Sequence, residues 1–500
     1  MSRRQFARGS AIQGTGWGVS LVLQAAHFAV AARFLTPTEF AAYVAALALY
    51  GITGALSEFG LQQTSVLAFQ TSDEARVMRA SVVASVLLGG ASLVVAVVIT
   101  ALALPRSVQD PALLLVPAFV IARAELPFQA LRQHRLQFGR VASAEVAGRV
   151  VALASLAVIA LGGDSLSTTG RFAAVGLTLA LGLSVSVIML IGRPSPQPDG
   201  RHGKPLSALR LIVEAVPLGL TNAASFVHVR IDQVILAAYG VTIALADYAI
   251  AYRLLDAAVA LVSAVGMVAL PLLARRPRHE RAQASREFGD LLSVLAVVMG
   301  MLAFIFAPQL VLLLGGHQYT YAAWLARLLS PALVVSVLNV SGAQLAIVER
   351  RASALLRIAI LGVALNVALN VALIPRYGVR ASAVATVVTE TIGAGLVARL
   401  AEMLVPGSID WVGMLAALGG FLIASFGGLA AWREVSIFAG CVVGVAGVVV
   451  ALLPLLGSAR HALAAWRARG RRDEPPPSGD VDPPTRSLPI PPTPPGRTQH

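Results

Sequence analysis

Long apolar runs alternate with short polar segments along almost the whole chain. A helix needs about 20 apolar residues to cross a hydrocarbon layer of about 30 Å, and fourteen runs of suitable length can be drawn in this sequence. They are 11–34, 39–67, 80–104, 111–131, 141–161, 171–192, 207–236, 243–271, 288–314, 321–347, 355–373, 380–404, 411–432 and 435–457. The pattern predicts an all-α polytopic membrane protein with about fourteen transmembrane helices.

Composition supports the same class of protein. Hydrophobic residues make up 57% of the chain, charged residues make up 13%, and the mean hydropathy is +0.77. A soluble domain cannot bury so much apolar surface. Cys441 is the only cysteine, so the chain has no intrachain disulfide and no thiolate cluster for zinc. The basic segment 1–10 leads into an apolar run without a small-residue cleavage site, which predicts a retained first helix.

The net charge of +14 raises the possibility of nucleic-acid binding, but the positions of the basic residues favour membrane orientation instead. With the N-terminus inside, 26 Lys and Arg fall in segments predicted to be cytoplasmic and six in segments predicted to be outside. Short cytoplasmic loops carry such an excess. Arg376 and Arg380 oppose the trend. The distribution predicts a protein of the cytoplasmic (inner) membrane with both termini cytoplasmic, and no nucleic-acid partner.

Two short matches suggest an internal duplication. Residues 41–43 resemble 246–248 at an offset of 205, and 142–144 resemble 352–354 at an offset of 210. Chance repetition of alanine-rich sequence is the alternative. Duplication predicts an N-terminal six-helix lobe over 1–200 and a C-terminal six-helix lobe over 206–405, with an additional helix pair at 411–457 and a disordered proline-rich cytoplasmic tail at 470–500.

The stretch 228–271 places ionisable groups within apolar runs, where they are costly unless they pair or line water. Arg253 and Asp256 are three residues apart, so on a helix they share a face, and Tyr252 lies on the same side. This polar face predicts part of a transport pathway.

Enzymatic motifs are weak or missing in the sequence. A Walker A loop needs Gly-Lys-Ser/Thr, whereas the sole lysine, Lys204, precedes Pro205. The pair His279-Glu280 has no second histidine at the spacing of a zinc protease. The predicted outward loops are short. We therefore expect no enzymatic activity, no cofactor and no metal site, and keep a membrane-embedded enzyme of cell-surface glycan assembly as the remote alternative.

Three segments carry a resemblance to a known family: 33–43, 228–271, and 366–378 continuing to Glu390. The third has the pattern Asn-x-x-x-Asn, then Ile-Pro-Arg-Tyr-Gly, then Ala-Thr-x-x-x-Glu. These segments resemble the polysaccharide transporters and O-antigen or lipid-linked oligosaccharide flippases of the multidrug/oligosaccharidyl-lipid/polysaccharide (MOP) superfamily. The sequence departs from the family at 380–382, where Arg-Ala-Ser replaces a run of small residues.

The resemblance implies two six-helix lobes around a cavity that opens alternately to either side. It implies a substrate of the polyprenyl-pyrophosphate-linked oligosaccharide type, and arginines within the bundle suit its phosphates. In the lipid II flippases, an arginine and an acidic residue three positions later line the cavity, and Arg253 and Asp256 match them. Candidate cavity residues are Arg253, Asp256, Arg33, Arg123, Arg230, Arg327 and Tyr252; candidate coupling-ion residues are Glu58 and Glu390.

Other interpretations stay open. A drug or cation antiporter of the MATE type in the same superfamily is the nearer alternative function. Expected partners are the lipid-linked glycan and membrane lipids, with a glycan polymerase or glycosyltransferase as a further possibility. Arg149 is expected to form a local ion pair with Glu145. Asn366 and Asn370 are expected to bond neighbouring helices, and Glu58 and Glu390 can equally have structural partners.

Overall fold

A computed structural model describes residues 3–162, 165–192, 207–240, 243–436 and 438–452. Within these ranges the chain is helical and contains no strand. This confirms the predicted all-α class. The expected tail at 470–500 and the expected boundary between the lobes near 200–206 lie outside the described residues.

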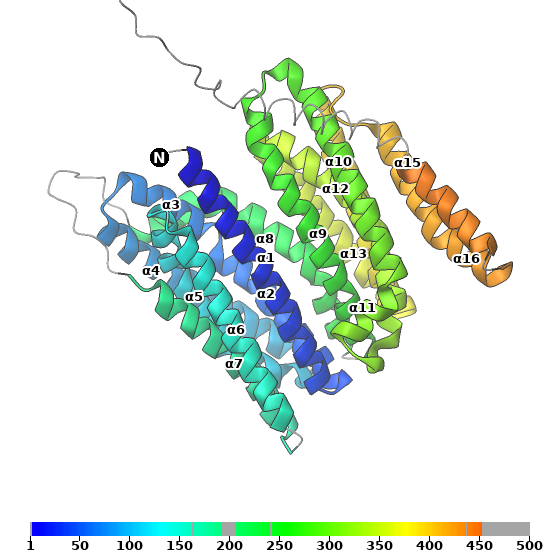
Figure 1. Cartoon of the computed structure of the whole chain (residues 1–500). Helices are drawn as coiled ribbons and strands as arrows, with labels where there is room; N and C mark the ends of the chain where they lie inside the picture. Colours follow the sequence, from blue (N-terminus) through cyan, green and yellow to red (C-terminus); the bar gives the residue numbers. More distant parts are fainter. Residues whose placement is uncertain (1–2, 163–164, 193–206, 241–242, 437, 453–500) are drawn as a thin grey trace, which may run out of the picture.

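The helices form two bundles, seen in blue to cyan and in green to yellow in Figure 1. The first bundle, named here the N-terminal bundle, contains α1 (Arg3–Phe34), α2 (Pro37–Glu58), α3 (Leu61–Thr71), α4 (Glu74–Ala103), α5 (Arg106–His134), α6 (Phe138–Gly162) and α7 (Thr168–Leu190). The second, the C-terminal bundle, contains α9 (Ile243–Arg275), α10 (Arg278–Ile305), α11 (Ala307–Leu314), η1 (His317–Tyr319), α12 (Thr320–Val348), α13 (Ala352–Tyr377) and α14 (Val379–Leu404). A further group of helices lies at the outer edge of the C-terminal bundle. It contains α15 (Trp411–Leu422), the π-helical turn η2 (Ile423–Gly427), α16 (Gly428–Glu434) and the helix Phe438–Leu452.

Helix α8 (Ala208–Tyr239) joins the two bundles. Its halves, Ala208–Val216 and Leu218–Tyr239, are bent by 61°. The helix contacts α2, α3 and α4 and also α13. The predicted division into lobes at 1–200 and 206–405 stays a prediction, because this helix belongs to both packing groups.

The span predicted at 39–67 is broken into α2 and α3. Phe59 (φ 41°) and Gly60 (φ 69°) adopt left-handed conformations between the two helices, which glycine tolerates and phenylalanine does not favour. Gly219 of α8 packs against this break, and a Cβ at Gly219 would lie 2.5 Å from the Phe59 ring. The close approach therefore requires glycine at position 219.

Eleven helices among the described residues are long and apolar enough to cross a membrane, or twelve if the bent α8 counts as one span. Two further apolar helices, Gly18–Phe34 and Phe438–Leu452, are shorter. A multi-pass membrane protein is thus confirmed, and the count of fourteen stays a prediction. Side chains such as Val86, Leu102 and Leu161 are largely exposed on the outside of the helices, as a surface in contact with lipid requires.

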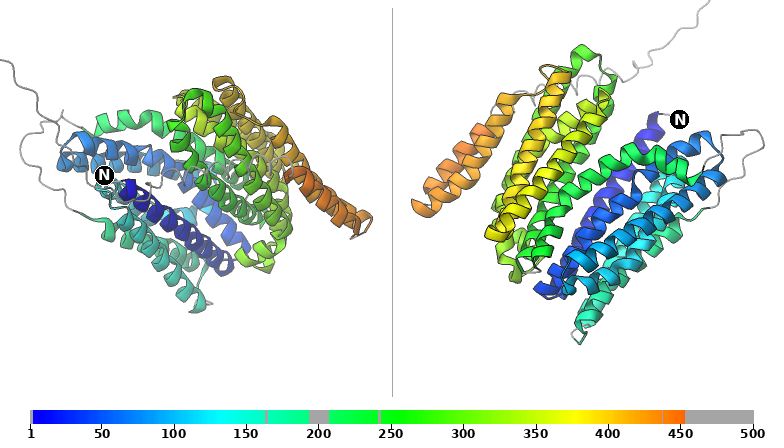
Figure 2. Two further views of the ribbon diagram at one scale, coloured as in Figure 1. Left: turned by 45° about the horizontal axis from the view of Figure 1, so that its top comes forward. Right: turned by 180° about the vertical axis from the view of Figure 1, so that it is seen from behind.

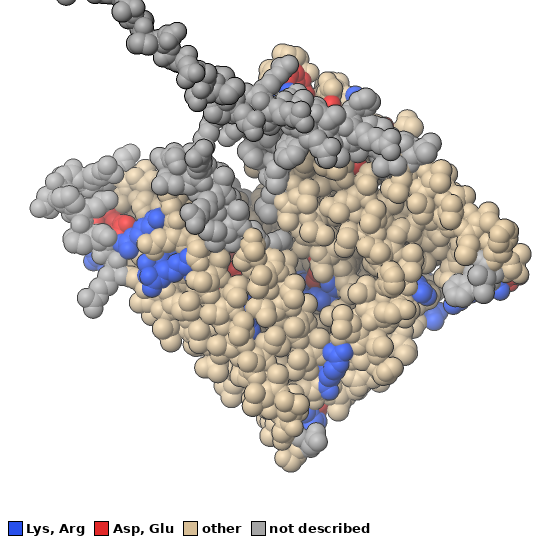
Figure 3. All heavy atoms as spheres, in the orientation of Figure 1, with Lys and Arg blue, Asp and Glu red and all other residues tan. Residues whose placement is uncertain are grey.

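The two bundles converge at one end of the molecule and diverge at the other (Figures 1 and 2). At the converging end, a continuous apolar core joins Phe28 and Phe40 of the N-terminal bundle to Tyr248 and Tyr319 of the C-terminal bundle. Figure 3 shows an almost uncharged outer surface on this side, with basic and acidic atoms between the bundles and at their ends. On the face drawn, charge therefore lies between the bundles and at their ends, and the apolar outer surface carries little of it.

Candidate functional site

Arg230 of α8 and Asp256 of α9 form an ion pair at the junction of the bundles. Arg230 Nη2 donates to Asp256 Oδ2 at 2.6 Å, and both side chains are 23% exposed. The guanidinium also lies over the Tyr252 ring, 5.6 Å from its centroid. Arg253 and Asp256 share a helix face as the sequence predicts, but the carboxylate pairs with an arginine of the neighbouring helix.

The side chain of Arg253 on α9 contacts helix α1 of the N-terminal bundle. Its guanidinium lies 5.2 Å from the centroid of the Phe28 ring on α1. Within the described residues it makes no ion pair or hydrogen bond. The cavity candidates thus include Arg230, which is paired with Asp256, and Arg253, which has no ion pair among the described residues.

Two of the candidate arginines lie beside glycines of α2. A Cβ on Gly51 would lie 3.9 Å from Arg230, and one on Gly54 would lie 3.7 Å from Arg123. Arg123 Nη1 donates at 2.9 Å to both Gly54 O and Ser57 Oγ. Arg123 and Arg230 therefore lie against successive turns of α2, although Arg123 is already bound to that helix.

Two further candidates lie apart from this group. Arg327 Nε donates to Phe304 O at 3.1 Å, so it fastens α12 to α10. Arg33 lies at the converging end, where it donates to the last carbonyls of α11: Leu312 O at 2.9 Å, Leu313 O at 2.6 Å and Leu314 O at 3.2 Å. Arg33 therefore links the two bundles.

The two coupling-ion candidates have different surroundings. Glu390 of α14 faces His228 of α8, with 3.1 Å between Oε1 and Nε2. Glu58 lies near enough to Arg123 for their charges to attract each other. The structure leaves the proposed ion-coupling role of both untested.

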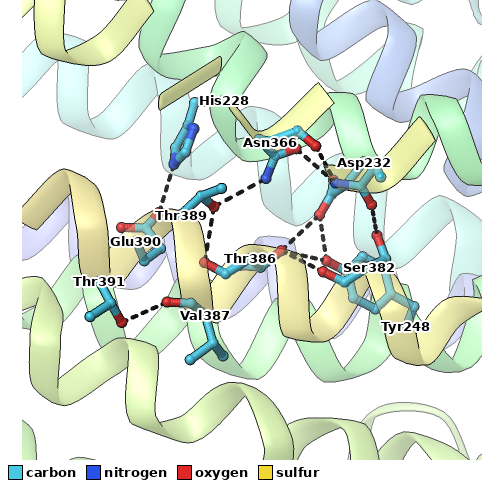
Figure 4. A network of polar contacts seen from close by, with 11 residues as sticks. His228, Asp232, Tyr248, Asn366, Ser382, Thr386, Val387, Thr389, Glu390 and Thr391 are labelled. Carbon is cyan, nitrogen blue, oxygen red and sulfur yellow. Dashed lines mark hydrogen bonds and ion pairs between the residues drawn. The ribbon is translucent and has the colours of Figure 1, made fainter. Parts of the chain in front are cut away.

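A buried polar network in the C-terminal bundle includes Asp232, which the sequence prediction left out (Figure 4). Asp232 is 1% exposed, and its carboxylate accepts hydrogen bonds from the Tyr248 hydroxyl and, at 3.4 Å, from Thr386 Oγ1. Its two oxygens thus have hydroxyl and backbone donors, and the described residues offer it no ion pair.

Asn366 and Asn370 of α13 continue this network into α14. Asn370 Oδ1 accepts from Ser382 Oγ at 2.6 Å, and Asn366 Nδ2 donates to Thr389 Oγ1 at 3.3 Å. The interhelical role predicted for the two asparagines is confirmed. Neither their spacing nor their type indicated that they lie beside Asp232, because this depends on how α8 packs against α13.

Residues of the N-terminal bundle contribute two more features. Arg149 of α6 does not form the predicted pair with Glu145, whose Oε1 accepts from Ser20 Oγ at 2.6 Å. A cavity of about 110 Å³ is lined by both residues and by Glu125, Gln129 and Ser186. No group of His, Cys, Asp and Glu in the described part of the chain could hold a metal ion.

Residues 30–324 match the family described as polysaccharide biosynthesis protein, over more than half of the 500 residues. The chain belongs to this family. No curated protein matches it.

Solved structures show the same fold at low sequence identity. The lipid II flippase MurJ, in an inward closed conformation, matches with a TM-score of 0.69 and 11% identity, over 92% of this chain and 100% of that chain. An inward-facing multidrug resistance MATE transporter of the MOP superfamily matches with a TM-score of 0.60 and 15% identity, over 78% and 94%. A MOP superfamily transporter from Pyrococcus furiosus, described as having a binding pocket of reverse polarity, matches with a TM-score of 0.55 and 14% identity, over 80% and 95%.

This polysaccharide biosynthesis family member therefore has the MOP fold, which confirms the resemblance predicted from its sequence. The matched structures carry the names of transporters and flippases. The expectation that the chain is not an enzyme stays a prediction, since a shared fold does not exclude catalysis.

Proposed function

We propose that this protein moves a polyprenyl-pyrophosphate-linked oligosaccharide from the inner to the outer leaflet of the cytoplasmic membrane by alternating access. Both termini face the cytoplasm in this proposal, so the diverging end of the bundles opens inward. The glycan would then pass to a polymerase or glycosyltransferase on the outer side.

The observation that carries the proposal is the pairing pattern at the junction of the bundles. Asp256 forms its ion pair with Arg230, and Arg253, which lies against Phe28, has no ion pair among the described residues. An arginine at membrane depth costs about 3 kcal/mol on insertion scales, so it is retained where it has a role. An anionic substrate supplies the missing charge.

Pyrophosphate suits this site better than a carboxylate or an amine would. A guanidinium presents planar, permanently charged donors that match phosphate oxygens, whereas an organic cation would be repelled. Arg230 of α8 binds Asp256, three residues along α9 from Arg253, and its guanidinium lies over the Tyr252 ring. The phosphates of a lipid-linked glycan can therefore meet both arginines, while its lipid chain stays in the membrane.

A drug or cation antiporter is the second candidate, and Asp232 is the observation in its favour. A carboxylate that is 1% exposed and has no ion pair among the described residues is a place where a proton or a small cation can be held. Such a site also serves coupling in a flippase, so it does not oppose the first proposal.

Reconstitution tests the proposal through Arg253. Proteoliposomes with a fluorescent polyprenyl-pyrophosphate oligosaccharide in both leaflets report flipping by a membrane-impermeant quencher. We expect Arg253→Gln to reduce the rate by about tenfold or more, because a charge-assisted hydrogen bond contributes about 1.5–3 kcal/mol. Arg253→Lys should recover part of the rate, since lysine lacks the bidentate fork.

Arg210→Gln is the matched control, because Arg210 forms an exposed pair with Glu214 within α8. This variant should flip the lipid at the wild-type rate. Wild-type flipping by a folded Arg253→Gln variant would contradict the proposed site. A cationic drug transported in place of the glycan lipid would favour the antiporter.

A further inference from the structure

His228 of α8 and Glu390 of α14 form a titratable pair within their helices, away from the helix ends. Glu390 Oε1 lies 3.1 Å from His228 Nε2, and the two side chains are 20% and 19% exposed. Figure 4 shows the pair at one end of the polar network, with Asp232 and Tyr248 at the other. Ionisable groups inside membrane-spanning helices are costly, and in transporters they are typical of proton pathways. The pair is therefore a candidate proton site distinct from Asp232.

The contact between the two side chains indicates where a proton can bind. An ionised Glu390 only accepts hydrogen bonds, so the Nε2 that faces it carries a hydrogen, and Nδ1 of the neutral ring is the free acceptor. Nδ1 is buried and has no hydrogen-bond partner among the described residues. Gly362 of α13 lies beside it, since a Cβ at Gly362 would be 3.5 Å from Nδ1. A proton on Nδ1 turns the neutral hydrogen bond into an ion pair between imidazolium and carboxylate.

The charged and titratable groups around the imidazole come from α8 and α9 as well as from α14. α8 and α9 contribute Arg230, Asp232, Tyr252 and Asp256. Arg230 and Asp256 bind each other at 2.6 Å. α13 and α2 face this part of α8 with Gly362 and Gly51, which carry no charge. Histidine is the member of this set whose unperturbed pKa lies near neutrality, so it exchanges a proton most readily.

We infer that His228 and Glu390 bind and release one proton in each transport cycle, with Nδ1 of His228 as the atom that takes it up. The inference rests on the proposed function, for which it names the coupling ion and its site. Opposite charges attract strongly in a medium of low dielectric constant. With the proton bound, the ion pair therefore holds α8 to α14 of the C-terminal bundle, and after its release a weaker hydrogen bond remains.

The position of the pair on α8 connects this change to the substrate site. His228 lies two residues before Arg230, so the two side chains point to opposite sides of the helix. On one side α8 meets Glu390 of α14, and on the other it meets Asp256 of α9. Since α8 joins the two bundles and contacts α2, α3 and α4 as well as α13, a change in how it is held to α14 alters the junction between the bundles.

The first test asks whether His228 titrates in the folded protein. Nuclear magnetic resonance spectra of the full chain in detergent, with labelled histidine rings, are recorded between about pH 5 and 9, a range centred near the unperturbed histidine pKa. The imidazole signal that is lost in His228→Gln should titrate in the wild type. Glu390→Gln should move its midpoint by about one pH unit or more, the effect of removing an adjacent opposite charge.

His279→Gln is the matched control, because the His279 side chain on α10 is 81% exposed. This variant should lose a different signal and leave the midpoint of His228 unchanged. A His228 signal that does not move over this range would overturn the proton site. So would a midpoint that Glu390→Gln leaves unchanged.

The second test asks whether the proton takes part in transport. Proteoliposomes with the fluorescent polyprenyl-pyrophosphate oligosaccharide report flipping at equal pH on both sides and with an imposed pH difference. A difference of about one unit should change the wild-type rate by up to about tenfold, the limit for one bound proton. His228→Gln and Glu390→Gln should flip without responding to the pH difference, whereas His279→Gln should respond like the wild type.

A structural role of the pair gives a different result in the same assay. It would lower the rate of His228→Gln by one factor at every pH and leave the response to the pH difference intact, and that outcome would overturn the inference. If His228→Gln does not flip at all, a pH-sensitive dye inside wild-type proteoliposomes decides. Proton movement that accompanies flipping supports the inference, and flipping without proton movement overturns it.

The inference and the proposed function fail in different ways. If the wild type flips the glycan lipid while His228 does not titrate, the proton site is wrong and the function stands. If His228 titrates with Glu390 as its partner but the wild type flips no glycan lipid at any pH, the proposed function is wrong and the titrating pair stands.

Discussion

The contact of Arg33 with the end of α11 predicts how firmly the converging end is closed. Its guanidinium reaches across the bundles to three backbone carbonyls at 2.9, 2.6 and 3.2 Å. Gln318 and Tyr319 reinforce the contact by donating to Ala32 O at 2.9 and 3.2 Å. Opening this end must break all of these bonds, so Arg33 acts as a latch.

The magnitude follows from the geometry and the exposure. A hydrogen bond to a charged group contributes about 1.5–3 kcal/mol when it is buried, but Arg33 is exposed, so we assign the three bonds together about 1.5 kcal/mol. Replacing Arg33 by glutamine should therefore shift the equilibrium towards opening of the converging end by about tenfold.

Spin labels replacing Arg106 and Arg376 at the converging end, in a Cys441→Ser background, measure this shift. Arg33→Gln should raise the population at long distances. Arg380→Gln is the matched control, because Arg380 lies at the same end but donates to Tyr321 within the C-terminal bundle at 2.7 Å. Unchanged distances in Arg33→Gln, or the same change in the control, would refute the latch.

Three further results are expected. Asp256→Asn should lower the free energy of unfolding by about 2 kcal/mol, because it leaves Arg230 without its ionic partner, and changing both Asp256 and Arg230 to leucine should recover most of that stability. Thermal melting in detergent compares the single and double variants. A double variant that loses the sum of the two single losses would contradict the ion pair. Removing 473–500 should leave folding and flipping intact, and a truncated protein that inserts but does not flip would show that the tail is needed. Reporter fusions at Ser458 and Gly316 should report cytoplasm and outside respectively, and the opposite result would invert the topology.

The apolar pattern predicted the fold well because a bilayer imposes a length on each helix. Every predicted span that is described coincides with a helix or a broken pair of helices, including the pair α2 and α3. The pattern did not predict the break at Phe59 and Gly60, since the left-handed turn is held by contact with Gly219 on a distant helix.

The candidate site was less predictable, because helical spacing says only which residues share a face. Arg253 and Asp256 share one, yet Asp256 binds Arg230 from α8. Likewise, the spacing of Glu145 and Arg149 suggested a local ion pair, whereas the Glu145 carboxylate accepts a hydrogen bond from Ser20 of α1. Partners from other helices decide these pairings, and a single sequence does not reveal them.

The same limitation applies to the arginines named as cavity candidates. Arg123 and Arg327 are ionisable groups within apolar runs, but in the structure each donates to a backbone carbonyl of a neighbouring helix. Asp232 was visible in the same stretch as Arg253 and was left out of the candidate site, because only packing shows that it is completely enclosed.

The most direct test of the central claim is the leaflet position of the lipid-linked glycan in cells from which this protein is depleted. Flipping predicts that the polyprenyl-pyrophosphate oligosaccharide accumulates on the cytoplasmic leaflet, protected from a glycan-modifying enzyme added outside, and that the wild type but not Arg253→Gln restores its exposure. Unchanged exposure of the glycan lipid on the outer leaflet after depletion, in cells with no second flippase, would contradict the account.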